Sequence, residues 1–128
     1  MREILFRGKI VDTGEWCYGD LTHDEDEDGL VELLFIRPTD QEYGYLVDPD
    51  TVGQFTGLYD KDGERIYEGD IVVTELWPGG HFLGVVVWRE KDCAFSVWLS
   101  ERNSTGVSTG CRAVGSIHDN PELLEVAE

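Results

Sequence analysis

Short runs of alternating apolar and polar residues, separated by turn-forming residues, are the feature that most limits how this chain can fold. In the segment 4–10, apolar residues recur at even positions and charged residues at odd positions, as in a half-buried strand. The apolar residues are Ile4, Phe6 and Ile10, and the charged residues that face the other way are Arg7 and Lys9. Asp12-Thr13-Gly14 then predicts a turn into a second strand, Trp16 to Leu21, so the first twenty residues are expected to form a hairpin.

The middle of the chain has longer connections. We expect the segment 22–29, "THDEDEDG", to be a solvated loop, because it offers nothing to bury. A strand rich in apolar residues is predicted from Leu30 to Ile36. In the segment 37–50 that follows, Pro38 and Pro49 exclude a helix interior.

Three strands rich in Val, Phe and Trp are predicted in the second half, at Ile71 to Trp77, Phe82 to Arg89 and Ala94 to Leu99. The connections between them, 78–80 and 90–93, are short enough for hairpins, so the three strands are expected to form an antiparallel meander.

The end of the chain is mixed. The segment 101–110 is expected to be a polar loop, and the segment 113–117 a last strand. A short C-terminal helix is predicted, with Asn120 as N-cap, Pro121 at the first helical position and Glu122 in the first turn. Many short strands with almost no helix predict an all-β (mainly β) protein, a barrel or a sandwich.

A chain of 128 residues fits one domain and can bury a sizeable core without a metal or a disulfide. Its three cysteines, Cys17, Cys93 and Cys111, include no CxxC pair, so we expect buried, reduced thiols. The segment 1–10 lacks the apolar run of a secretory signal, and no segment has the length of a membrane span. We therefore expect a cytoplasmic protein that does not bind membranes.

The chain carries 27 acidic and 10 basic residues, a net charge of −17. Up to Glu64 there are 17 acidic and 5 basic residues, so the first half is the more acidic one. Such a field repels nucleic-acid phosphate, so direct nucleic-acid binding is disfavoured unless folding gathers a basic patch. A basic protein partner fits this charge, and so does ordinary solubility.

The run Asp24-Glu25-Asp26-Glu27-Asp28-Gly29 matches the first six positions of an EF-hand calcium loop. Position 12 of that loop would be Phe35, where a bidentate Glu is required, and the flanking segments are predicted strands. A solvated acidic loop is the favoured interpretation, and no metal ligand is assigned.

A second stretch, "TGLYDKDGERIYEGDIV" (56–72), also resembles part of a calcium loop at Asp60 to Gly63. It lacks ligands at positions 1 and 12, and no Gly-Lys-Ser/Thr sequence makes it a phosphate loop. Asp60 and Gly63 instead suit the first and fourth positions of a type I turn. We expect "RIY" to be a very short strand, with a second bend at Gly69.

No nucleophile stands beside a base in a known motif. His23, His81 and His118 are each expected at or near loops, and the cysteine and histidine spacings carry no zinc signature. No catalytic residue and no cofactor is therefore assigned. Trp98 is predicted on the face of its strand opposite Phe95, Val97 and Leu99. There it either anchors a partner or a subunit contact, or is covered within a small closed barrel or by the N-terminal region.

Three segments together resemble the YopX family, small proteins carried mostly by bacteriophages and prophages. They are "FRGKIVDTGEWCYGDL" (6–21), "VDPDTVGQFTGLYDKDGERIYEGDIV" (47–72) and "GSIHDNPELLE" (115–125). The resemblance implies a β-rich fold, with an N-terminal β region at 1–50 and an SH3-type small barrel with the C-terminal helix at 51–128, within one compact unit. It implies a protein that acts in the bacterial cytoplasm, and it supplies no catalytic or binding residues.

Two hypotheses follow for the function. The first is a non-enzymatic phage accessory module that binds a protein, such as a basic host protein. The alternative is a metal-dependent hydrolase acting on nucleotides or nucleic acid through the Asp24–Asp28 cluster. Assembly into a homo-oligomer is compatible with the first hypothesis.

Overall fold

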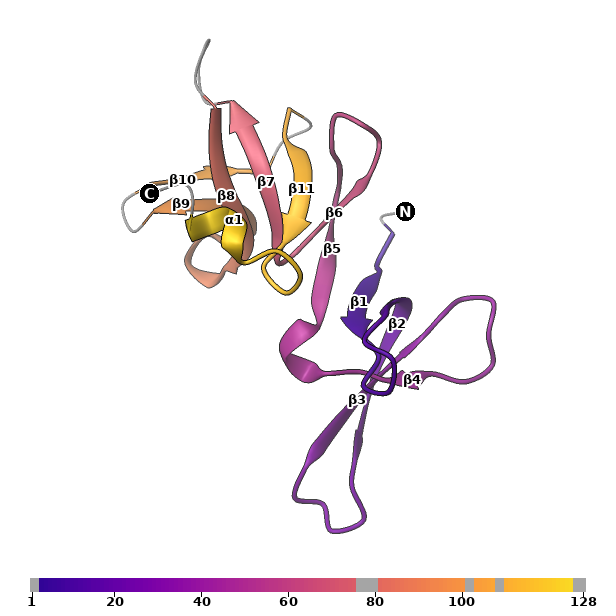
Figure 1. Ribbon diagram of the computed structural model, residues 1–128. Helices are drawn as coiled ribbons and strands as arrows, with labels where there is room; N and C mark the ends of the chain where they lie inside the picture. Colours follow the sequence, from indigo (N-terminus) through magenta and orange to yellow (C-terminus); the bar gives the residue numbers. More distant parts are fainter. Residues whose placement is uncertain (1–2, 76–80, 101–102, 108–109, 126–128) are drawn as a thin grey trace. The chain divides into compact units, whose positions relative to one another are not determined.

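The computed structural model describes residues 3–75, 81–100, 103–107 and 110–125 (Figure 1). Antiparallel strands dominate this part of the chain, so the predicted all-β class is confirmed. The chain divides into two compact units, Met1–Phe55 and Thr56–Glu128, called unit 1 and unit 2 below.

Unit 1 is an antiparallel sheet in the order β4-β3-β2-β1, with the first residues of β5 paired to β1. Its strands are β1 (Phe6–Lys9), β2 (Trp16–Glu25), β3 (Glu32–Arg37), β4 (Tyr45–Leu46) and the start of β5 (Gly53–Tyr59). The predicted N-terminal hairpin is confirmed: β1 pairs with β2, and the N–H of Gly14 donates to the carbonyl of Ile10 at 2.8 Å. A 3-10 turn, η1 (Pro49–Thr51), begins at a proline, where the missing N–H costs nothing.

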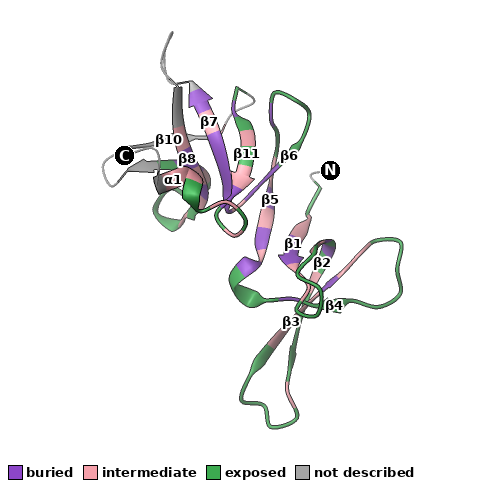
Figure 2. Ribbon diagram, in the orientation of Figure 1, coloured by how far each residue is buried: buried purple, intermediate pink, exposed green. Residues whose placement is uncertain are grey.

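The core of unit 1 lies on one face of this sheet. Cys17, Ile36 and Val47 are almost fully buried. Partly buried side chains that pack against them are Phe6, Ile10, Leu21, Leu34 and Val52. Burial is concentrated near β1 and the base of the β2–β3 hairpin, whereas the distal part of that hairpin is mainly exposed (Figure 2).

The structure differs from the predicted strands of unit 1 at the acidic segment. Strand β2 does not stop at Leu21 but continues to Glu25, and the connection shrinks to 26–31. The reason is backbone pairing: Thr22 and His23 lie opposite Phe35 and Leu34, so polar side chains do not prevent the ladder from continuing.

Unit 2 holds a second antiparallel sheet in the order β10-β9-β8-β7-β11. Its strands are β7 (Asp70–Glu75), β8 (His81–Arg89), β9 (Ala94–Ser100), β10 (Asn103–Gly106) and β11 (Arg112–Ser116), and the end of β5 pairs with β6 (Arg65–Tyr67). The predicted meander is confirmed as β7-β8-β9, with a 3-10 turn, η2 (Glu90–Asp92), in its second connection. The first connection, 78–80, lies outside the described residues.

One expectation for unit 2 is wrong. The segment 101–110 was expected to be a loop, yet Asn103–Gly106 forms β10 against β9. Backbone hydrogen bonds to a neighbour are enough for an edge strand, even where the side chains show no alternation.

The buried core of unit 2 gathers residues from four strands and a connection. Ile66, Val72, Val86, Val97 and Cys111 are each 0 % exposed. The predicted C-terminal helix is present as the short α1 (Glu122–Glu125), and residues 126–128 lie outside the described part. Closure of this sheet into an SH3-type barrel stays a prediction.

Candidate functional site

The tip of the β2–β3 hairpin carries the acidic run that the sequence singled out. The carboxylate of Asp26 accepts hydrogen bonds from the N–H groups of Leu30 (3.0 Å) and Val31 (3.3 Å). The N–H of Asp26 donates to the carbonyl of Val31 at 3.0 Å. Asp26 therefore holds the loop in shape, which is how aspartate commonly acts in turns.

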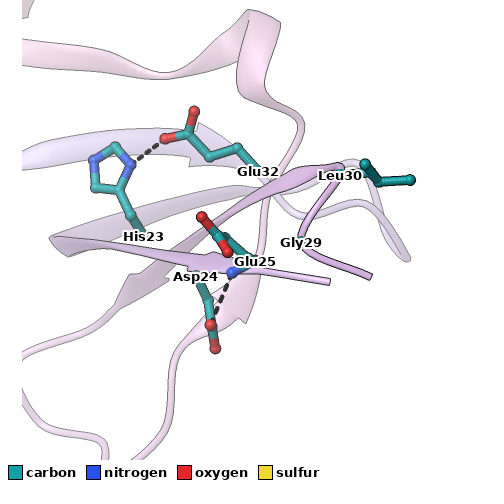
Figure 3. A pocket seen from close by; sticks show the side chains of 6 residues that line it. All are labelled: His23, Asp24, Glu25, Gly29, Leu30 and Glu32. Carbon is teal, nitrogen blue, oxygen red and sulfur yellow. Dashed lines mark hydrogen bonds and ion pairs between the residues drawn. The ribbon is translucent and has the colours of Figure 1, made fainter. Parts of the chain in front are cut away.

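Beside this loop lies an open hollow of about 540 Å³ (Figure 3). It is lined by His23, Asp24, Glu25, Gly29, Leu30 and Glu32. Nδ1 of His23 pairs with the carboxylate of Glu32, and Oδ1 of Asp24 accepts from the N–H of Glu25 at 2.8 Å. Figure 3 shows Leu30 pointing away from these groups, and Leu30 is 83 % exposed.

The calcium and hydrolase interpretations both need several carboxylates that converge on one point. Successive strand residues point to opposite faces, so Asp24 and Glu25 diverge, while Asp26 is engaged with backbone N–H groups. Within the described ranges no group of three His, Cys, Asp or Glu side chains is placed to hold a metal ion.

The second calcium-like stretch is a turn built on a buried carboxylate. Oδ1 of Asp60 accepts from the N–H groups of Asp62 and Glu64, both at 2.9 Å, and Oδ2 accepts from the N–H of Ala113 at 3.0 Å. The N–H of Gly63 donates to the carbonyl of Asp60 at 3.1 Å, and Gly63 has a φ of +82°. The predicted turn from Asp60 to Gly63 is confirmed.

The surroundings of Asp60 set its ionisation. Burial alone would raise the pKa of this carboxyl, since it disfavours the charged form. The three backbone N–H donors outweigh burial, and the charge of Arg112 adds to them, so the pKa of Asp60 is lowered. Asp60 is thus an ionised acceptor for backbone groups, and three of its acceptor positions are already used.

The second predicted bend is also present. Gly69 has a φ of +91°, and its N–H donates to the carbonyl of Val86 at 2.8 Å. Oδ2 of buried Asp70 accepts from the N–H of Tyr67 at 2.8 Å. Asp60, which lies in the calcium-like part of this stretch, and Asp70, which lies at the bend, are therefore both structural.

The histidines and cysteines are dispersed. His23 lies in β2 and not in a loop, His118 follows β11, and the side chain of His81 lies outside the described part. None of the three cysteines forms a disulfide bond. Cys17 and Cys111 are buried, and burial raises the pKa of Cys17.

The expectation of buried thiols is wrong for Cys93, which is exposed. It follows η2 as the C-cap residue with a left-handed φ of 50°, and its thiol donates to the carbonyl of Glu90 at 3.5 Å within the turn.

Trp98 lies as predicted on the face of β9 opposite Phe95 and Val97, since it pairs with Val85 whereas Val97 pairs with Val86 of the core. It is 40 % exposed. Sequence reasoning missed a second aromatic surface, in unit 1, where Trp16 and Tyr18 of β2 share a face with Phe35 of β3. Alternate positions 16, 18 and 33, 35 carried this signal, but the register between β2 and β3 was needed to combine them.

Fold and sites together define a small all-β protein with two antiparallel sheets, whose conspicuous polar features are an acidic hairpin tip and buried turn aspartates. The model of the YopX protein family matches residues 5–125, so the chain belongs to the YopX family.

A likeness among solved structures supports the fold. The crystal structure of protein EF1440 from Enterococcus faecalis aligns with a TM-score of 0.55 at 20% sequence identity, covering 97% of this chain and 99% of that one. No curated protein matches the chain. The helices of the described part include none with the length and apolarity needed to cross a membrane.

Proposed function

We propose that the chain is a phage- or prophage-encoded accessory protein of the bacterial cytoplasm that binds another protein through an acidic surface and catalyses no reaction. Membership of the YopX family supports the phage context. The partner we propose is a basic host protein.

The observation that carries the proposal is the exposed acidic hairpin tip. Five carboxylates there are solvent-exposed, namely those of Asp24, Glu25, Glu27, Asp28 and Glu32. Carboxylates that act as general acids or nucleophiles are usually shielded by burial or a cleft, whereas charges on an open projection steer and orient a partner of opposite charge.

A matched pair of variants tests this proposal. In the tip variant, four exposed acids are neutralised as Asp24→Asn, Glu25→Gln, Glu27→Gln and Asp28→Asn, and Asp26 is kept because it shapes the loop. The control variant removes the same charge elsewhere in unit 1, by Asp12→Asn, Glu15→Gln, Asp40→Asn and Glu42→Gln, all exposed.

Immobilised wild type, tip variant and control are incubated with host lysate at low and high salt. We expect a basic protein to be retained by the wild type and the control and lost by the tip variant, with weaker retention at high salt. Retention of nothing at low salt, or equal retention by the tip variant, would contradict the proposal.

Titration calorimetry addresses the enzymatic alternative. Saturable binding of Ca²⁺, Mg²⁺ or Mn²⁺ to the wild type that is lost on Asp24→Asn with Asp28→Asn would favour the hydrolase instead. We expect the wild type and this double variant to give the same weak heats on addition of each metal ion.

A further inference from the structure

We draw no further inference here: the strongest candidate, the apolar surface patch of Trp16, Tyr18 and Phe35 on the sheet of unit 1, is partly exposed, and nothing in the described part of the structure shows what covers it.

Discussion

Replacing Asp60 by asparagine should destabilise unit 2 although the side chain keeps its shape. Asp60 is 6 % exposed and holds three backbone N–H groups from two parts of the chain. An amide oxygen can still accept from Asp62 and Glu64. The amide nitrogen would then point at the N–H of Ala113, so a donor would face a donor.

The loss of stability follows from the single contact between the side chain of residue 60 and the N–H of Ala113. A hydrogen bond to a charged group contributes about 1.5–3 kcal/mol, and a buried donor left without an acceptor costs about 1–3 kcal/mol. Because these two effects overlap, we expect Asp60→Asn to lower the free energy of unfolding by about 2–4 kcal/mol. Asp60→Ala leaves all three donors without their acceptor and should cost more.

Asp62→Asn is the matched control in the same turn. Asp62 has a side chain that is 55% exposed and forms an ion pair of 3.0 Å with Arg112. Exposed ion pairs contribute about 0–1 kcal/mol, so this variant should be nearly neutral.

Urea unfolding is followed by pulse labelling of Cys111, which is 0 % exposed and lies in unit 2. This readout reports the opening of unit 2 separately from unit 1. Equal labelling midpoints for Asp60→Asn and Asp62→Asn would refute the role assigned to the carboxylate.

The pH dependence has a definite sign. The pKa of Asp60 is lowered in the folded state, so its contribution is fully present above the unfolded pKa of about 3.9 and is lost as pH falls through the folded pKa. The stability difference between wild type and Asp60→Asn should therefore be constant at neutral pH and shrink below about pH 4.

Three further perturbations test other parts of the structure. Gly63→Val should destabilise unit 2 by about 1–2 kcal/mol through the left-handed φ alone, since an added Cβ meets nothing within 4 Å; an unchanged urea midpoint would argue against this turn. Gly19→Ala should cost more in unit 1, because the new Cβ would lie 2.0 Å from a carbonyl oxygen of β3, and a loss of β-sheet circular dichroism or a lower midpoint checks it. In thiol titration of the native protein, Cys93 should react at once whereas Cys17 and Cys111 react only on unfolding; three equally fast thiols would contradict the assigned burial.

Local sequence patterns were sufficient to predict the structure where it depends on residues that are close together in the chain. The turn at Asp60 to Gly63 depends on an acceptor at one position and a glycine three residues later, and both are visible in the sequence. The meander β7-β8-β9 could likewise be predicted from the sequence, because its apolar residues alternate regularly and Val86 and Val97 face the core.

Contacts between distant segments were not predictable in the same way. The carboxylate of Asp60 reaches Ala113 across 53 residues, and no local signal marks that contact. The surface that Trp16 and Tyr18 share with Phe35 depends on the register of β2 against β3, which a single-residue shift would reverse. Strand β10 has polar side chains and is defined by its neighbour alone.

The place of β11 in its sheet has a consequence for synthesis on the ribosome. This strand is the last of the described strands but pairs with β7, the first strand of the meander. The turn at Asp60 also depends on β11, because the N–H of Ala113 donates to the carboxylate of Asp60. Unit 2 cannot complete its hydrogen bonding until residues 111–116 have left the exit tunnel, whereas unit 1 has all its strands by residue 55. A nascent chain arrested before residue 111 should therefore display the free edge of β7, and this intermediate is the one most in need of a chaperone.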